Sequence, residues 1–224
     1  MDMQIYVIRH GETAMNLESR LQGWLDEPLN ENGILVAQLT GKALRDVRFD
    51  RVISSPLSRA KETARLILEE NRFPVPVETD ERLKEIKWGC WEGLCCDPEH
   101  FEVPDKRFSD FFYDPMRFQG PSDGESIRDV IRRTEAFLRE LISDPQNHGK
   151  TILVSTHGCA MRALLNVVYE NREDFWQGRL PPNCAVSIVK VENGLCCLLA
   201  QDKVLYDPSL YHAAYADPGS PRKR

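Results

Sequence analysis

The sequence lacks the long apolar runs and the basic excess that mark membrane-spanning and nucleic-acid-binding proteins. No stretch approaches the ~20 apolar residues of a membrane span, and residues 1–4 carry no basic segment. We therefore expect no membrane partner and no secretory signal, and we predict a cytoplasmic protein. The formal net charge of −6 argues against a nucleic-acid partner. Any attraction for an anionic substrate must then come from a local basic pocket.

The seven cysteines provide neither a disulfide framework nor a thiolate zinc site. Their number is odd, Cys95-Cys96 and Cys196-Cys197 are adjacent pairs, and no Cys-x-x-Cys occurs. None of them is followed six positions later by arginine, as the active site of a cysteine phosphatase requires. We expect most of the cysteines to be reduced, buried, small residues.

Short apolar runs alternate with segments of helical periodicity along the chain. Asn193-Gly194, between the last two runs, predicts a tight hairpin. The alternation predicts an α/β fold, a three-layer sandwich with a mostly parallel sheet, helices on both faces and a lid insertion. The predicted strands are residues 4–8, 51–54, 75–78, 151–155, 185–191 and 195–200.

Two helix starts are predicted from local sequence. Ser55-Pro56 has the residue types of an N-cap and a first helical position. Ser122-Asp123-Gly124-Glu125 has the pattern of a capping box. Each predicts a helix that begins at that point.

The length of 224 residues fits one domain, which we predict over residues 1–216 with a lid insertion at about 94–121. The polar tail, residues 217–224, is expected to be flexible. One interpretation of the insertion is that one or two aromatic residues and one basic residue select the substrate. The alternative is that the aromatic residues anchor the insertion to the body. The residues concerned are Phe101, Phe108, Phe111, Phe112, Tyr113, Met116 and Phe118, with Lys106, Arg107 and Arg117 between them.

Basic side chains follow three of the predicted strands. Arg9-His10 ends the first strand, Arg59 lies in the helix after the second, and His157 ends the strand at 151–155. Because ligands bind beyond the carboxyl ends of parallel strands, we expect these groups to meet at one edge of the sheet. Glu85 can reach the same edge from the segment that follows the strand at 75–78.

This combination suits a phosphate. Planar guanidinium groups bind phosphate oxygens through two hydrogen bonds at once, and the loop after His10 can add backbone N–H donors. A cationic neighbourhood also disfavours imidazolium and keeps His10 neutral and nucleophilic. Phosphate monoester hydrolysis needs accelerations of up to ~10²¹-fold, which no single group supplies, so a cluster is required.

Four ordered blocks of residues resemble the histidine phosphatase superfamily, in its phosphoglycerate-mutase-like branch. They span residues 5 to about 165, and four blocks in family order are far more specific than one tripeptide. The blocks are Arg9-His10-Gly11-Glu12-Thr13 with Asn16 and Arg20-Leu21-Gln22-Gly23, Ser54-Ser55-Pro56-Leu57-Ser58-Arg59-Ala60, Leu83 to Gly93, and Val154-Ser155-Thr156-His157-Gly158.

The resemblance implies a role for each matching residue. His10 would be the phosphorylated nucleophile, and Glu85 would protonate the leaving oxygen and then help to activate water. Arg9, Arg59 and His157 would bind the phosphoryl oxygens. The residues implied to line the pocket and bind phosphate are Thr13, Asn16, Gln22, Gly23 and Gly158.

The expected activity is that of a histidine acid-type phosphatase, a phosphoric monoester hydrolase without metal or cofactor. Trp91-Glu92-Gly93 and Leu21-Gln22-Gly23 look more like phosphatases for alpha-ribazole or sugar phosphates than like mutases. The mutases of the family share a Glu-Arg-His-Tyr-Gly block, whereas this chain has Glu85-Ile86-Lys87-Trp88-Gly89. A small phosphorylated substrate is expected as the partner, with the protein as a monomer or homodimer.

Other interpretations remain open beside this one. A cofactor-dependent phosphoglycerate mutase and a non-catalytic phosphate-binding relative share the fold. A metal site on His10, His157 and Glu85 has suitable ligand types, but two neighbouring arginines would repel the cation. Gly149-Lys150-Thr151 resembles the end of a nucleotide-binding loop, yet position 144 is Asp144 where that motif needs glycine.

Overall fold

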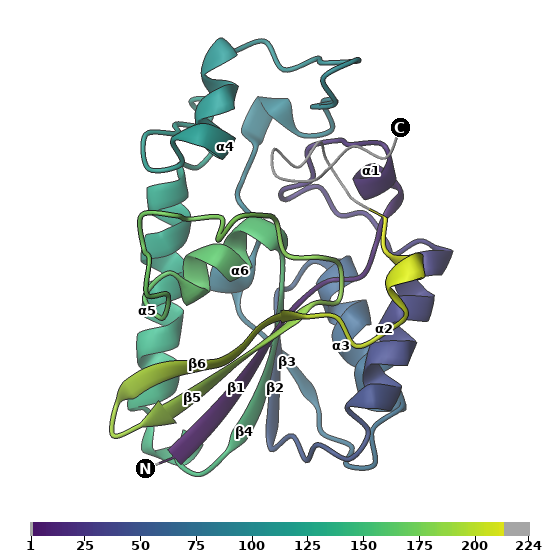
Figure 1. Ribbon diagram of the computed structural model, residues 1–224, viewed down its shortest axis with the longest axis vertical. Helices are drawn as coiled ribbons and strands as arrows, with labels where there is room; N and C mark the ends of the chain where they lie inside the picture. The colour runs from purple at the N-terminus through teal and green to yellow at the C-terminus, as the bar shows by residue number, and fades with distance from the viewer. Residues whose placement is uncertain (1, 213–224) are drawn as a thin grey trace.

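The computed structural model describes residues 2–212 and contains one six-stranded sheet in the order β3-β2-β4-β1-β5-β6 (Figure 1). β3, β2, β4 and β1 run parallel to one another, whereas β5 pairs antiparallel with β1 and forms with β6 the antiparallel hairpin predicted around Asn193-Gly194. This arrangement confirms the predicted mostly parallel α/β sheet. The strands are β1 (Asp2–Arg9), β2 (Arg51–Ser54), β3 (Val77–Thr79), β4 (Thr151–Thr156), β5 (Val186–Glu192) and β6 (Leu195–Lys203).

Helices cover both faces of the sheet, with α2 and α3 on one face and α5 and α6 on the other (Figure 1). Short 3₁₀ turns at 81–83, 89–91, 106–109, 145–147 and 208–210 connect the elements. No helix within residues 2–212 is long and apolar enough to cross a bilayer. The α-helices are α1 (Ala14–Leu17), α2 (Glu31–Ala43), α3 (Ser58–Glu69), α4 (Asp110–Tyr113), α5 (Ile127–Ser143) and α6 (Gly158–Leu165).

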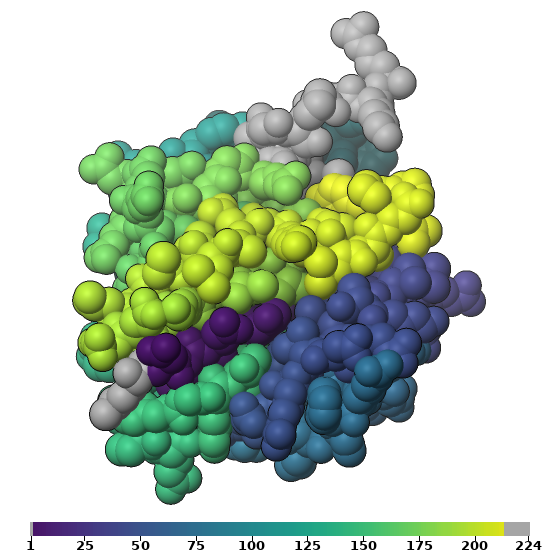
Figure 2. All heavy atoms as spheres, turned by 60° about the horizontal axis from the view of Figure 1, so that its bottom comes forward, coloured from purple at the N-terminus to yellow at the C-terminus, as the bar shows by residue number. Residues whose placement is uncertain are grey.

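β1 runs through the middle of the molecule because its side chains are apolar on both faces. Ile5 and Val7 pack into the core beneath α5 and α6, and Ile8 packs into the core beneath α2 and α3. A strand buried on both faces needs helices on both sides, which is the arrangement of a parallel sheet. In Figure 2 the purple residues of β1 lie between the green-to-yellow β5–β6 hairpin and the teal segment of β4.

The parallel register brings the carboxyl ends of three strands to one edge. Arg9 of β1 pairs with Thr156 of β4, and Ser54 of β2 pairs with Ser155. The loops that follow these strands therefore leave the sheet side by side, and the chemistry-bearing residues follow directly from them.

Residues 94–121 pack on the body through a third, aromatic-rich core. Phe108, Phe111 and Phe118 are buried there with Trp88 and Trp91. The anchoring interpretation is therefore confirmed for these three phenylalanines. Phe101 and Tyr113 are exposed, and the predicted tail at 217–224 lies outside the described residues.

Both predicted helix starts were wrong by a few residues. α3 begins at Ser58, because the Ser55 hydroxyl pairs with His157 and the Ser58 N–H bonds the Asp26 carboxylate instead. α5 begins at Ile127 with Ser126 as its N-cap in a capping box with Asp129. Tertiary partners therefore compete with the local capping pattern at α3, whereas α5 begins at a capping box a few residues beyond the predicted one.

The structure contains only free cysteines among the described residues. Cys95, Cys96, Cys159 and Cys184 are buried, as expected, whereas Cys90 and Cys197 are exposed. Burial raises the pKa of the Cys159 thiol well above its ordinary value, which suits a packing residue and not a nucleophile.

Candidate active site

The structure brings the predicted catalytic residues together at the carboxyl edge of the sheet. Arg9 is the last residue of β1 and His10 follows it. His157 follows β4, Arg59 lies in the first turn of α3, and Glu85 lies in the loop after β3. All five side chains are at most 8% exposed. The centroids of the His10 and His157 rings are 5.1 Å apart.

The His10 ring is held in one tautomer. Its Nδ1 lies 2.6 Å from the carbonyl oxygen of Gly11. Because a carbonyl oxygen can only accept, Nδ1 carries the proton and donates it. In the neutral ring Nε2 then has a free lone pair, which is the form that a nucleophilic histidine requires.

Burial and two arginines keep both histidines neutral. The pKa of His10 is well below its ordinary value, mainly because of burial and then because of the Arg59 and Arg9 charges. The pKa of His157 is likewise well below its ordinary value, with burial again the largest cause and Arg59 the next. A neutral His10 at physiological pH is therefore available for attack.

These lowered pKa values predict how stability depends on pH. Below about pH 6.5 each histidine binds a proton in the unfolded chain but not in the folded chain. The free energy of unfolding should therefore fall as pH drops from about 6.5 toward the folded pKa values, by at most about 1.4 kcal/mol per pH unit for each histidine. Urea unfolding of the wild type, His10→Gln and His157→Gln at several pH values measures this slope.

The variants should show a shallower decline than the wild type. Equal slopes in all three proteins would show that neither buried histidine is held neutral.

Backbone carbonyls orient both arginines. Arg9 donates from Nη1 to the carbonyl of Pro181 at 2.6 Å. Arg59 donates from Nη1 to Leu25 at 3.0 Å and from Nη2 to Gly23 at 2.7 Å. Each guanidinium therefore has a fixed plane, as recognition of phosphate oxygens by a planar fork requires.

The Glu92 carboxylate supports the loop that orients Arg59. Its two oxygens accept from the backbone N–H groups of Gly23, Trp24 and Leu25 at 2.8–3.2 Å. The same loop offers the carbonyls of Gly23 and Leu25 to Arg59. Glu92 thus acts on the site through the loop, a role that the Trp91-Glu92-Gly93 match alone did not reveal.

Glu85 lies at the N-terminus of α6. Its carboxylate accepts from the N–H groups of Cys159 and Ala160, both at 3.0 Å, and from Ile86 at 2.9 Å. Burial raises the pKa of Glu85, and these hydrogen bonds and the Arg59 charge oppose that rise without cancelling it. A carboxyl group with a raised pKa retains its proton more readily, which suits a general acid.

His157 is held by Ser55 from the end of β2. Its Nε2 lies 2.7 Å from the Ser55 hydroxyl oxygen, and no hydrogen-bond partner occurs for the buried Nδ1 among the described residues. If the hydroxyl donates to Nε2, Nδ1 carries the proton and becomes a donor for a bound anion. Sequence reasoning had assigned Ser55 to a helix cap and missed this contact.

A small pocket opens beside His10. Arg9, Glu85, Asn16, Gln22 and Gly158 contribute to its wall together with His10. Two buried donors on this wall, Arg9 Nε and Gln22 Nε2, have no hydrogen-bond partner within the described part of the protein. Donors placed in this way suit an anion. The remaining wall residues are Leu21, Ile86, Trp88, Phe111, Phe112, Cys159 and Leu180.

Thr13 and Gly23 do not line the pocket as predicted. Thr13 caps α1 and donates to Gln22 at 3.0 Å, and Gly23 bonds to Arg59 through its carbonyl. Thr13 therefore supports the wall residue Gln22, and Gly23 supports Arg59, although neither lines the pocket itself. Arg59 and His157 are also absent from the wall and are fully buried, and the His157 ring lies directly beside the His10 ring.

Asn183 is a further residue that sequence reasoning missed. Its side-chain amide donates to the His10 carbonyl at 3.0 Å and to Asn16 Oδ1 at 3.2 Å. It therefore links the nucleophile loop to the wall. Within residues 2–212, no group of three or more His, Cys, Asp or Glu side chains is arranged to hold a metal ion.

The fold and the site define an α/β protein with paired histidines and arginines around an anion pocket at the edge of the sheet. The chain belongs to the histidine phosphatase superfamily, branch 1, whose family model matches residues 5–202.

Similar proteins include both phosphatases and mutases. A phosphatase, PhoE, of Bacillus subtilis is 33% identical over 184 residues, covering 82% of this chain and 86% of the relative. A 2,3-bisphosphoglycerate-dependent phosphoglycerate mutase of Gloeobacter violaceus is 37% identical over 164 residues, covering 72% and 73%. The solved structure of Bacillus stearothermophilus YhfR is 31% identical with a TM-score of 0.79, covering 90% of this chain and 98% of that one.

Proposed function

We propose that the protein is a phosphatase that hydrolyses small phosphorylated metabolites through a phosphohistidine on His10, without metal or cofactor. The observation that carries this proposal is the His10 tautomer, with Nδ1 donating to Gly11 and Nε2 free beside two arginines. We place the activity in the cytoplasm, in a monomer or homodimer.

The proposed reaction has two steps. The lone pair of His10 Nε2 attacks phosphorus, a N–P bond forms, and the ester P–O bond breaks as the Glu85 carboxyl group gives its proton to the leaving oxygen. Water then attacks phosphorus while the Glu85 carboxylate takes a proton from it. A new O–P bond forms, the N–P bond breaks with its electron pair returning to His10 Nε2, and inorganic phosphate leaves. Arg9, Arg59 and His157 stabilise the charge on the transferred phosphoryl oxygens.

The pocket wall favours a phosphatase over a mutase. Apart from Arg9, no Lys or Arg side chain lines the pocket among the described residues. Phosphoglycerate carries a carboxylate beside its phosphate, and that second anion would need its own cationic or hydrogen-bonding partner. Most of the remaining wall residues are apolar, among them Leu21, Trp88, Phe111 and Leu180, which suits an uncharged or aromatic leaving group.

Two residues of the 94–121 segment, Phe111 and Phe112, supply the part of this wall that could select the substrate. The basic residue expected in that role is absent from the wall. Arg107 pairs with Asp105, Arg117 pairs with Asp114, and Lys106 is exposed. Selection by apolar contact is therefore the interpretation that the structure supports.

Incubation with 3-phosphoglycerate distinguishes a phosphatase from a mutase. This comparison is needed because one relative, 37% identical, is a phosphoglycerate mutase. We expect slow release of inorganic phosphate and no 2-phosphoglycerate, because the wall has no cationic side chain besides Arg9 to hold the carboxylate among the described residues. An aryl phosphate should be hydrolysed faster than 3-phosphoglycerate. Formation of 2-phosphoglycerate without phosphate release would identify a mutase and overturn the proposal.

A further inference from the structure

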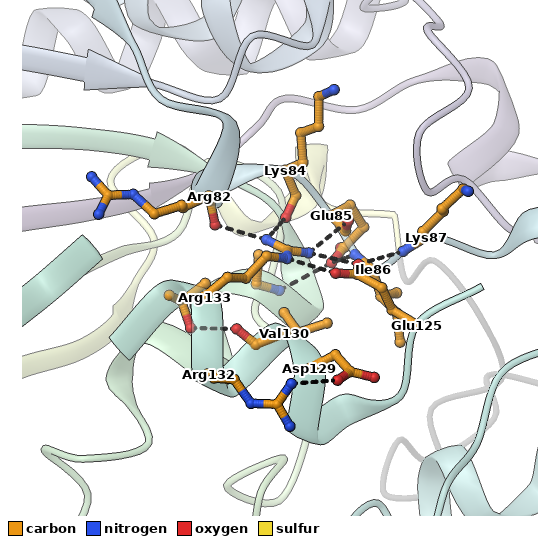
Figure 3. Close-up of polar contacts among 12 residues, drawn as sticks. Arg82, Lys84, Glu85, Ile86, Lys87, Glu125, Asp129, Val130, Arg132 and Arg133 are labelled. Carbon is orange, nitrogen blue, oxygen red and sulfur yellow. Dashed lines mark hydrogen bonds and ion pairs between the residues drawn. The ribbon is translucent and has the colours of Figure 1, made fainter. Parts of the chain in front are cut away.

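Arg133 of α5 points at the segment that carries Glu85 and binds its backbone (Figure 3). Its Nη1 donates to the carbonyls of Arg82 at 2.7 Å and Lys84 at 2.6 Å. Its Nη2 donates to the carbonyl of Glu85 at 2.9 Å. One guanidinium thus binds three carbonyls within four consecutive residues.

Glu125, just before α5, completes this contact. Its carboxylate accepts from Arg133 Nε at 2.9 Å and Nη2 at 3.0 Å. It also accepts from the backbone N–H of Lys87 at 2.9 Å, while the N–H of Glu125 donates to the Lys87 carbonyl at 2.9 Å. All five N–H donors of the Arg133 guanidinium are therefore used, and the chain is held on both sides of Glu85.

Residues 84–87 need such support because they belong to no helix or strand. Backbone polar groups buried in a loop have to find partners outside regular structure. Besides the Arg133 bonds, Thr156 donates to the Leu83 carbonyl at 2.8 Å and Trp24 donates to the Glu85 carbonyl at 2.9 Å. The position of the Glu85 backbone therefore depends on side chains from other elements, of which Arg133 contributes the most bonds.

We propose that Arg133, oriented by Glu125, is a positioning residue that holds Glu85 where its proton reaches the leaving oxygen. This inference rests on the proposed phosphatase function. Arg133 itself does not line the pocket, so it acts on the substrate only through other residues. Its hydrogen bonds go to the segment that carries Glu85, and its charge is one of the smaller causes that lower the pKa of His157. Catalytic groups work only within narrow limits of position, and a displacement of about 1 Å can reduce a rate about 10²-fold.

The test measures the first-turnover release of two leaving groups. Phenyl phosphate needs a proton on its leaving oxygen, whereas 2,4-dinitrophenyl phosphate does not. Arg133→Met removes the donors and keeps the apolar stem, so we expect phenol release to slow about 10²-fold and dinitrophenol release to slow less than about threefold. Arg133→Lys keeps the charge but lacks the planar guanidinium with its five donors. Its phenol release should therefore be nearly as slow as that of Arg133→Met.

Arg132 supplies the matched control. It is the neighbouring arginine of α5, its side chain is 78% exposed against 16% for Arg133, and it pairs with Asp129 (Figure 3). Arg132→Met should leave both release rates unchanged. If Arg133→Met does not fold, Arg133→Lys carries the same comparison.

A double-mutant cycle with Glu85→Gln decides the proposal. Once the acid is removed, Arg133 has no proton donor to position, so Arg133→Met should slow phenol release no further in the Glu85→Gln background. Additive losses, or equal slowing of both substrates, would assign Arg133 a merely structural role and overturn the inference. Failure of the wild type to hydrolyse any phosphate ester would instead end the proposed function.

Discussion

His10→Ala should abolish turnover of every phosphate ester, with a fall of at least about 10⁴-fold in kcat. The imidazole is the group proposed to form the bond to phosphorus, and loss of a nucleophile leaves only binding and charge stabilisation. The second effect is on labelling. Brief incubation of the wild type with a substrate carrying radioactive phosphate, followed by quenching, should leave acid-labile, base-stable phosphate on the chain, and His10→Ala should carry none.

His10→Ala also removes contacts within the site, besides the nucleophile. The substitution removes the ring beside His157 and the hydrogen bond to Gly11, but it leaves Arg9 and Arg59 anchored to their carbonyls. His10→Ala should therefore still bind inorganic phosphate, and titration calorimetry measures this binding. His100→Ala, on an exposed residue, controls for handling and should keep full turnover and label. Wild-type turnover in His10→Ala would remove the basis of the proposed mechanism.

The strand-end residues of the site were predictable from the sequence because their placement follows from local pattern and sheet geometry. Arg9 ends a strand that is apolar on both faces, and His10 and His157 directly follow such strands; parallel strands share one carboxyl edge. Glu85 was harder to place, because its loop has no periodicity that fixes a direction. Resemblance to a family, and not spacing, assigned its role.

The supporting residues were not predictable, because each acts through a contact distant in the chain. Arg133 has the residue type of a solvated helix position, yet it lies three residues after Val130 and four before Phe137, both buried on the inner face of α5. This spacing from two buried apolar residues is the one sequence signal that could have identified Arg133 as an inward-facing arginine. Glu92 and Asp26 likewise bond to segments about 30 or more residues away, which no local pattern encodes.

Glu85→Gln should separate the two proposed steps of the reaction. For phenyl phosphate the first-turnover release of phenol should slow about 10²–10⁴-fold, because the amide cannot donate the proton that the leaving oxygen needs. For 2,4-dinitrophenyl phosphate the first turnover should persist at nearly the wild-type rate. The second step should then stall, because no carboxylate remains to take a proton from water. A burst of dinitrophenol equal to the enzyme concentration, followed by slow turnover, is the expected trace.

The stalled enzyme should also retain label on His10, so the burst and the phosphohistidine can be measured in one sample.

Glu85→Gln also changes hydrogen bonds, and the resulting loss of stability must be separated from the loss of the proton donor. The Glu85 carboxylate accepts three backbone N–H groups, whereas an amide keeps one acceptor oxygen and turns a donor toward the N-terminus of α6. Thermal unfolding of Glu85→Gln will show that cost as a lowered Tm, but lost stability slows both substrates alike. Only a missing proton donor distinguishes phenol from dinitrophenol, and equal slowing of the two would remove Glu85 from the acid role.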